Sequence, residues 1–291
     1  MIEKCITDKT KIFEIKTNSL IEFNTTDVDK FNVIAKKISE ETGVPQDLIY
    51  TAPYFFFINH WHKIDGEWFF YKSNGSNFHF INELLGEVIT NFFGLDTIHY
   101  KIAKLNVEGN KGEYGLISKN FCEIGNTYKT VWDYGFAPRK DLCVLENIRN
   151  ICQSEKEYLL LLEDLKKFFI RDFYVSQSDR TGNNFLFKIT SDGIRLAPLY
   201  DYEYSFESIK PHIYRNQIAQ VNITNSETQS LFRKDLKFQE LLYLIMRADM
   251  QSFINEVEDK HKILVPSEYK ELYKKHDTKI KRLVLENKLI K

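Results

Sequence analysis

Residues 179–201 have the sequence DRTGNNFLFKITSDGIRLAPLYD, in which a polar loop is followed by a predicted β-hairpin and one acidic residue. Asp179 and Asn184 stand five positions apart in the loop (184 − 179 = 5), so their side chains can point into the same space. The segments FLFK and IRLA flank the turn SDG, and this pattern predicts two short antiparallel strands. A hairpin brings the chain back to where it began. Asp201, which follows the hairpin, should therefore lie near Asn184.

These three polar side chains offer the chemistry that phosphoryl transfer needs. Asn184 and Asp201 provide an amide and a carboxylate, the hard oxygen ligands that Mg²⁺ prefers and shares with substrate phosphates. Asp179 is then free to accept a proton from a substrate hydroxyl. Phosphoryl transfer depends on positioning and charge neutralisation more than on covalent catalysis, so this division of roles fits the reaction.

A second group of candidate residues precedes the loop in the sequence. Lys72 ends a predicted strand, and the predicted helix that follows carries Glu83 and Glu87. The phosphates of a nucleotide need a fixed cation, and a Lys–Glu ion pair would hold the ammonium group of Lys72 in place. Together with the polar loop, this lysine would complete a nucleotide site.

The N-terminal part of the chain is predicted to be rich in strands. Aromatic strands are expected at about 54–63 and 67–72, and the Asp-Gly pair between them is typical of a tight hairpin turn. A helix is expected at 81–93, where apolar residues recur at helical spacing and a glycine closes the pattern. Two further strands are predicted at 99–106 and 113–120.

Helices dominate the rest of the predicted structure. One is expected at about 26–43, and a longer one at 154–169 opens with a capping-box pattern. The chain is mostly helical from about residue 226, and the last helix is predicted at 267–291. Its buried stripe is expected to contain Leu272, His276, Ile280 and Leu283. Strands that precede helices, without an internal repeat, predict an α+β protein with two lobes, and a cleft between lobes is a usual place for a ligand.

The composition restricts the class of protein. The chain of 291 residues is 43% hydrophobic, which provides a sizeable core and excludes disorder as its main state. Lys plus Arg number 40 and Asp plus Glu number 41, so the formal charge is −1, which argues against nucleic-acid binding. No apolar run approaches the ~20 residues of a membrane span, and the N-terminal MIEKCITDKTK lacks the apolar stretch of a secretory signal. We therefore expect a cytoplasmic protein without a membrane partner; export as an effector is the alternative.

Four motifs in sequence order carry a resemblance to a known family. Lys72 at a strand end is followed by INELLGEVITNFFGL at 81–95, an N-E-apolar helix that closes in G-L. YGLISKNF at 114–121 is a strand that leads into an extended segment, and DRTGNN and LAPLYD follow it. This order, with D-R-x-x-x-N before P-x-x-D, resembles the HipA-like protein kinases. The resemblance extends from about Phe69 to Ser205, which is 137 of 291 positions (205 − 69 + 1 = 137).

The resemblance implies a two-lobed protein-kinase-like fold and phosphorylation of Ser/Thr hydroxyls, including the protein's own, with ATP and Mg²⁺. It implies that Asp179 is the catalytic base and that Asn184 and Asp201 are metal ligands. Lys72 would bind the phosphates, and Glu83 would be its ion-pair partner. Backbone groups of the hinge segment would hold the adenine, and this segment consists of Ser118, Lys119, Asn120 and Phe121.

The resemblance also divides the chain and suggests its partners. Residues 1–50 would be an N-terminal extension or part of the N-lobe, 51–121 the N-lobe and 122–291 a helical C-lobe. The chain is shorter than full-length HipA and resembles the short, free-standing bacterial members of the family. Some members are toxins that an antitoxin controls, so an antitoxin or another protein partner is a further expectation. The protein substrate is not indicated.

Three departures from the family pattern leave other functions open. Thr181 stands where the family often has histidine. Asp201 is followed by Tyr202 and Glu203 where a glycine is common, and no Gly-rich loop precedes the strand lysine. The alternatives are a nucleotide-binding pseudokinase that acts as an interaction module and a toxin-like kinase that acts through a partner. A metal-dependent phosphoesterase is less favoured, because no histidine lies near the loop in sequence to complete a hydrolytic metal site.

Each candidate residue also has a purely structural interpretation. Asp179 lies in a polar turn of the kind that is usually found at a protein surface. Asp201 could cap the next segment, and Lys72 could be an ordinary strand-end lysine. Glu83 and Glu87 could form the solvated face of their helix. The site hypothesis is favoured because these residues occur together and in the order that the resemblance requires.

Overall fold

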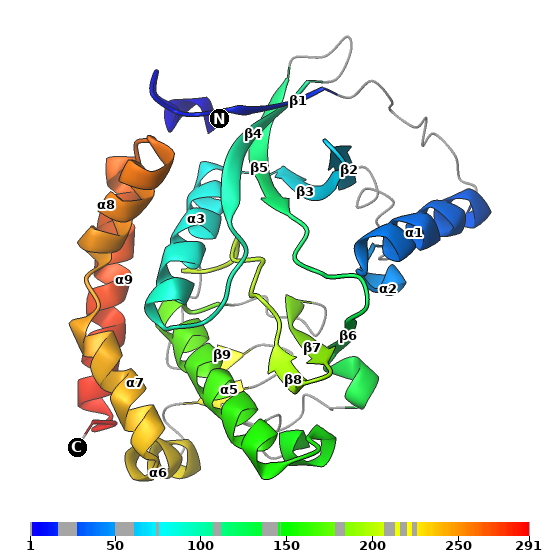
Figure 1. Cartoon of the computed structure of the whole chain (residues 1–291). Coiled ribbons are helices and arrows are strands. Elements are labelled where there is room, and N and C mark those ends of the chain that lie inside the picture. Colours follow the sequence, from blue (N-terminus) through cyan, green and yellow to red (C-terminus); the bar gives the residue numbers. More distant parts are fainter. Residues whose placement is uncertain are drawn as a thin grey trace.

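The computed structural model has a strand-rich part and a helix-rich part, which are joined by the segment that follows β5 (Glu113–Lys119) (Figure 1). Strands β1 to β5 make up the first part, and α5 and the C-terminal helices make up most of the second (Figure 1). The structure describes residues 2–16, 28–49, 61–73, 76–106, 112–135, 145, 147–177, 184–206, 213–215, 220–222 and 226–290.

A five-stranded sheet organises the strand-rich part, in the order β1-β4-β5-β3-β2. Neighbouring strands are antiparallel except for β1 and β4, which are parallel. The predicted Asp-Gly turn joins β2 to β3: Asp65 and Gly66 have φ angles of 50° and 84°, a left-handed conformation that glycine adopts without strain. The other strands of the sheet are β1 (Phe13–Lys16), β2 (Trp61–Ile64), β3 (Glu67–Ser73) and β4 (Tyr100–Asn106).

Helix α3 (Asn77–Phe92) lies between this sheet and the C-terminal helices (Figure 1). Its N-cap is Ser76, whose side chain accepts a backbone hydrogen bond and so satisfies one of the free N–H groups of the first turn. All residues from 80 to 90 are buried, because sheet residues such as Ile102 and Leu116 cover one side and helices cover the other. The helix is therefore fixed from both sides.

A three-stranded sheet and a long helix organise the helix-rich part near the joining segment. The strand order is β6-β7-β8, with both pairs antiparallel, and the β7–β8 hairpin is the predicted one. The Glu157 side chain of α5 accepts hydrogen bonds from the backbone N–H of Gln153 and of Ile194, so it ties the helix start to β8. These elements are β6 (Thr127–Thr130), α5 (Glu155–Val175), β7 (Leu186–Thr190) and β8 (Gly193–Leu196).

The C-terminal helices follow one another along the outside of α3 and α5 (Figure 1). They are α6 (Ser226–Lys234), α7 (Leu236–Arg247), α8 (Met250–His261) and α9 (Ser267–Glu286). The remaining elements are short or peripheral: η1 (Ile2–Lys4), α1 (Val28–Thr42), α2 (Gln46–Ile49), η3 (Trp132–Tyr134), η4 (Ile148–Ile151), β9 (Ile213–Arg215) and β10 (Gln220–Asn222). None of the helices in the described ranges is long and apolar enough to cross a membrane.

The predicted α+β fold with a strand-rich N-lobe and a helical C-lobe is confirmed, and several predicted elements have different bounds. Helix α3 begins at Asn77 rather than at residue 81, and α9 ends at Glu286 rather than at residue 291. The strand expected at 54–63 is β2, which begins at Trp61, and residues 54–60 lie outside the described part of the chain. The helix expected at 154–169 continues to Val175. Residues 168–175 are buried on every side, so their apolar pattern has no helical period from which the extension could be predicted.

The predicted buried stripe of the last helix is confirmed at His276 and Ile280 and wrong at its other two positions. Leu272 has 42% of its side chain exposed, and Leu283 is only partly buried. The residues of α9 that are buried against the rest of the protein are Tyr273, His276, Ile280 and Val284. The stripe is rotated because the buried face is built around Tyr273 and His276, whose polar atoms find hydrogen-bond partners inside the protein.

Four of the described strands were not predicted: β1, β6 and the paired strands β9 and β10. The first two are held by their partners rather than by their own pattern. β1 pairs in parallel with β4, and β6 pairs with β7. Each is four residues long, too short for a clear alternation. β1 belongs to residues 1–50, so part of that segment lies in the five-stranded sheet. The division at residues 50 and 121 stays a prediction.

Candidate active site

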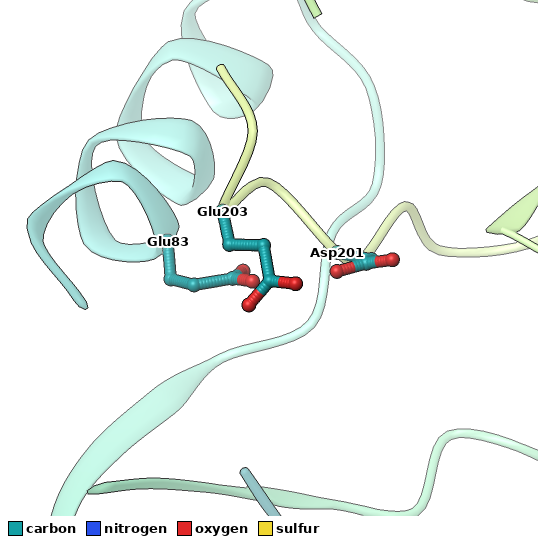
Figure 2. A group of neighbouring side chains, drawn as sticks. All are labelled: Glu83, Asp201 and Glu203. Carbon is teal, nitrogen blue, oxygen red and sulfur yellow. The ribbon is translucent and has the colours of Figure 1, made fainter. Parts of the chain in front are cut away.

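The Nζ atom of Lys72 contacts three carboxylates, which Figure 2 shows gathered at one place. It lies 2.6 Å from Oε1 of Glu83, 2.5 Å from Oδ1 of Asp201 and 3.2 Å from Oε2 of Glu203. One oxygen from each carboxylate lies within 4.8 Å of one from each of the others. Carboxylates at such distances repel one another, so the cluster needs a cation among them, and Lys72 supplies it.

Glu83 is the most firmly held of the three carboxylates. Its side chain is fully buried, and Oε1 accepts the hydrogen bond from Lys72. Oε2 accepts hydrogen bonds from the Tyr100 hydroxyl at 2.7 Å and from the Tyr202 backbone N–H at 3.0 Å. Both oxygens therefore have partners on three different elements, which fixes the carboxylate and, through it, the ammonium group of Lys72.

Glu87, the other candidate on α3, has a different environment. One of its oxygens contacts Nδ1 of His99 at 2.8 Å and Nζ of Lys260 at 2.5 Å, and the other accepts from the Tyr100 backbone N–H. Lys260 belongs to α8, so Glu87 connects α3 to the C-terminal helices. The structure thus brings Glu83, and not Glu87, to Lys72.

Asp201 and Asn184 lie side by side, as the predicted hairpin requires. The Asn184 side-chain N–H donates to Oδ2 of Asp201, while Oδ1 of Asp201 contacts Lys72. The backbone of Asp201 has a left-handed φ of 63°, a conformation that costs free energy for a residue with a side chain. Gln177 stabilises this conformation, because its side-chain N–H donates to the Asp201 carbonyl at 3.1 Å.

The segment that follows Asp201 is attached directly to α3. The side-chain N–H groups of Asn82 donate to the carbonyls of Glu203 at 2.7 Å and of Ser205 at 2.8 Å. The Tyr273 hydroxyl from α9 donates to Oδ1 of Asn82 at 2.9 Å, so every hydrogen-bonding group of this amide is used. Asn82 thereby joins the segment, α3 and α9 at one buried point.

The cluster changes the pKa of its members. Burial alone would lower the pKa of Lys72, but Asp201, Glu83 and Glu203 together hold it well above its ordinary value. Burial raises the pKa of Glu203 above its ordinary value, and the nearby Asp201 and Glu83 carboxylates add to this, whereas Lys72 opposes it. Burial and the Glu83 carboxylate likewise raise the pKa of Tyr100. Lys72 is therefore a permanent cation at neutral pH.

Of the four predicted hinge residues, Ser118 and Lys119 end β5 and Asn120 and Phe121 follow it, and the structure gives them different environments. Ser118 is buried within the sheet, whereas the exposed Lys119 side chain pairs with Glu67 at 2.5 Å. The Phe121 ring lies against Tyr200, just before Asp201, with ring centroids 5.6 Å apart. Of these four residues, Phe121 is the one in ring contact with the residue next to the carboxylate cluster.

Asn120, the remaining predicted hinge residue, has a structural function in this segment. Its backbone N–H donates to the carbonyl of Trp68, and its side-chain N–H groups donate to the carbonyls of Thr42 at 2.8 Å and Cys122 at 2.9 Å. Thr42 is the last residue of α1, so the helix pair α1–α2 supports the hinge segment. Gly43 allows this close approach, because a Cβ atom there would lie 3.1 Å from the Glu123 carbonyl oxygen.

The predicted catalytic base, Asp179, lies in the loop 178–183, outside the residues that the structure describes. Both residues that flank this loop contact Asp201: Gln177 through the Asp201 carbonyl and Asn184 through its carboxylate. The two ends of the loop are therefore fixed at the same residue. This arrangement is the one expected if Asp179 and Asn184 are to serve one site.

Three residues of the site were not predicted as such. Glu203 was noted in the sequence only as a departure from the family pattern, although an acidic residue two positions after Asp201 was a usable signal. Asn82 and Gln177 act through hydrogen bonds to backbone carbonyls, and nothing in their local sequence indicates such partners. Ser205 is fully buried and donates to Gln177 at 2.6 Å, so it too is part of the packing.

Comparison with solved structures identifies the class of fold. No protein-family profile and no curated protein matches the sequence. The structure is similar to that of the Helicobacter pylori proinflammatory kinase CtkA, with a TM-score of 0.56, 15% identity, and coverage of 78% of this chain and 91% of CtkA. This chain therefore has a kinase-like fold, as the resemblance to HipA-like kinases predicts.

A second solved structure matches a larger share of this chain than CtkA does, with a lower TM-score. It is the HipA, HipB and operator DNA complex of the Shewanella oneidensis MR-1 toxin–antitoxin system. The match has a TM-score of 0.49 and 12% identity, and it covers 86% of this chain and 70% of the chain it matches.

Proposed function

We propose that this protein is a kinase that transfers the γ-phosphate of ATP to Ser/Thr hydroxyls of proteins, with Mg²⁺ as the metal. The observation that carries this proposal is the convergence of Lys72, Glu83 and Asp201, from three separate parts of a kinase-like fold, with Asn184 beside Asp201. Residues that merely occupied surface turns would have no reason to meet around one ammonium group.

Lys72 is suited to bind the phosphates of the nucleotide. Its ammonium group is fixed by Glu83, whose own position depends on Tyr100 and Tyr202. A cation held in this way needs little reorganisation when a phosphate binds, and positioning of this kind is the main contribution a protein makes to phosphoryl transfer.

The oxygen-rich group around Asp201 fits a hard divalent cation. The Asn184 amide and the Asp201 carboxylate are in direct contact, and Glu203 offers a further carboxylate close by. Asn184 and Asp201 would hold the ion, because Mg²⁺ takes carboxylate and amide oxygens together with substrate phosphates. When bound, the ion would neutralise negative charge on the phosphates.

Asp179 would accept the proton of the substrate hydroxyl. The proposal for Asp179 is supported by the two described residues that flank its segment in sequence, Gln177 and Asn184, because both contact Asp201. A carboxylate that is not bound to the metal can act as a general base and can orient the hydroxyl for attack.

Transfer of labelled phosphate from ATP tests the proposal. Wild-type protein should incorporate label into itself or a generic protein substrate, and Asp179→Ala should reduce this by about 100-fold or more. Asp192→Ala is the matched control, because Asp192 is an exposed aspartate in the β7–β8 turn. Equal incorporation by wild type and Asp179→Ala would refute the kinase proposal.

A nucleotide-binding pseudokinase is the second candidate. It is favoured by one observation: Tyr202 and Glu203 follow Asp201, and the Glu203 carboxylate contacts Lys72. A pseudokinase would be stabilised against thermal unfolding by ATP with Mg²⁺ but would transfer no label. Absence of any ATP-dependent increase in Tm would remove this candidate.

A further inference from the structure

The hydrogen-bonding capacity of Lys72 limits what else can bind to it. An ammonium group has three N–H donors and no acceptor. Three carboxylates contact this one, at 2.6, 2.5 and 3.2 Å. Glu83 and Asp201 accept hydrogen bonds from it, and Glu203 forms an ion pair with it, so a phosphate oxygen must compete with one of these carboxylates for the ammonium group. The structure indicates which one this would be.

Glu83 is the carboxylate least able to leave. It has no exposed surface, and besides Lys72 it accepts hydrogen bonds from Tyr100 and Tyr202. Moving it would leave a buried hydroxyl and a buried backbone N–H without their acceptor, which costs about 1–3 kcal/mol for each group.

Asp201 is also held by more than Lys72. Its second carboxylate oxygen accepts a hydrogen bond from Asn184, and its backbone carbonyl accepts one from Gln177. A movement of Asp201 would therefore break its contacts with both Asn184 and Gln177.

Glu203 is different, because its backbone is fixed whereas its carboxylate has fewer contacts among the described residues than those of Glu83 and Asp201. Among the described residues, its carboxylate has one ion pair, the one with Lys72, and this is the longest of the three distances. Its side chain is 20% exposed and that of Asp201 is 23% exposed, so the contacts, and not the exposure, distinguish the two. The backbone carbonyl of Glu203, in contrast, is fixed by Asn82. The Glu203 side chain can therefore rotate away from Lys72 while the backbone stays in place.

We propose that the Glu203 carboxylate competes with a nucleotide phosphate for Lys72, and that its rotation away from Lys72 is a required step of nucleotide binding. The inference rests on the proposed nucleotide site. Glu203 weakens nucleotide binding in two ways. It forms an ion pair with Lys72, which a phosphate must replace, and its negative charge repels the triphosphate until the side chain has moved. This residue therefore sets the affinity for nucleotide without taking part in phosphate transfer.

Calorimetric titration of ATP in EDTA, without divalent metal, tests the proposal on three variants. Glu203→Gln has a side chain of the same shape without the charge, and it should bind ATP about tenfold more tightly than wild type. Glu203→Asp retains the charge but withdraws it from Lys72 by one methylene group, and it should also bind more tightly, though less so. Glu240→Gln is the control, because Glu240 is an exposed glutamate on α7 that pairs with Lys237. Its affinity should equal that of wild type.

The results separate this inference from the proposed function. If wild type binds ATP and Glu203→Gln binds it equally or less tightly, the inference is refuted and the nucleotide site stands. If Glu203→Gln binds more tightly but Glu203→Asp does not, the effect is general charge repulsion, and competition for Lys72 is refuted. If binding is seen only when Mg²⁺ is added, the same variants are compared under that condition. If none of the folded proteins binds ATP either in EDTA or with Mg²⁺, the proposed function fails and the inference with it. Melting curves establish folding, and Glu203→Asp decides alone if Glu203→Gln is unfolded.

Discussion

Glu83 and Glu87 have the same side chain and lie one turn apart on α3, yet their surroundings assign them different roles. Glu83 contacts Lys72, whereas Glu87 connects α3 to Lys260 of α8. Both are fully buried, so burial alone does not distinguish them. The partner of each carboxylate does, and this difference can be tested with the same substitution at both positions.

We expect Glu83→Gln to lower kcat for phosphate transfer by about 100-fold, because Lys72 loses the partner that positions it and small misplacements have effects of this size. Glu87→Gln should leave kcat near the wild-type value and lower the free energy of unfolding by about 1–3 kcal/mol, because it weakens hydrogen bonds to charged groups. Labelled-ATP kinetics and urea unfolding measure the two effects. Equal losses of kcat in the two folded variants would contradict the assigned roles.

The residues that meet at Lys72 could be predicted from sequence only where a motif contains them. Lys72, Glu83, Asn184 and Asp201 each belong to a motif, and the structure brings them together. Glu203 belongs to no motif; its place two positions after Asp201 was a signal, but its contact with Lys72 depends on the fold. The roles of all of these residues in catalysis stay predictions.

Helix α3 has a glycine where the segment after Asp201 crosses it. A Cβ atom on Gly86 would lie 2.3 Å from Cγ of Tyr202, at the root of the ring rather than at a flexible end. The guanidinium group of Arg171 lies on the Tyr202 ring, 4.3 Å from its centroid, and also donates to the Gly86 carbonyl. The Tyr202 ring is therefore enclosed and has no room to withdraw from a larger residue.

We expect Gly86→Ala to destabilise the protein although alanine is the better helix former by about 1 kcal/mol. The added methyl group must displace Tyr202 and with it the adjacent Asp201, so phosphate transfer should fall together with the free energy of unfolding. Overpacking of this kind typically costs about 1–3 kcal/mol. Asn91→Ala is the control on the same helix, because Asn91 is exposed. A Gly86→Ala protein as stable and active as wild type would show that the segment is not held by this contact.

An element could be predicted when the residues that define it lie within its own short stretch of sequence. The β7–β8 hairpin and the turn before β3 have clear turn residues, and both were predicted. The short strand β1 was missed because only its parallel pairing with β4 identifies it. The end of α5 was missed for a different reason, since that part of the helix is buried on all sides and has no polar face.

Across the whole molecule, the N-terminal residues connect the two parts of the fold. Leu264, in the turn after α8, donates its backbone N–H to the Cys5 carbonyl at 2.8 Å. A few residues later the chain enters the five-stranded sheet as β1. The segment therefore runs from the C-terminal helices to the edge of the sheet (Figure 1). The sequence predicted the two-lobed fold but not this connection, because it depends on contacts between residues about 260 positions apart.

The connection can be weakened without changing either lobe. The hydroxyls of Thr7 and Thr10 both donate to the carbonyl of Lys262, at 2.6 and 2.5 Å. Lys262 ends α8 in a left-handed conformation, with φ of 54°, so this carbonyl lies at the end of a helix, where acceptors lack partners within the helix. Thr7→Val with Thr10→Val removes both donors and keeps the shape of the side chains. It also removes the acceptors of the Thr7 and Lys9 backbone N–H groups, which contribute to the loss. The loss should be about 1–2 kcal/mol in the free energy of unfolding.

Urea unfolding of the double variant measures this loss, and Thr278→Val is the control. The Thr278 hydroxyl donates to the Lys274 carbonyl within its own helix, so its removal affects no contact between the lobes. The double variant should keep the kcat of wild type, because neither threonine contacts Lys72 or any of the three carboxylates that pair with it. A loss no larger than that of Thr278→Val would mean that the N-terminal segment is held by the sheet alone. In that case the pairing of β1 with β4, and not the turn after α8, would be its point of attachment.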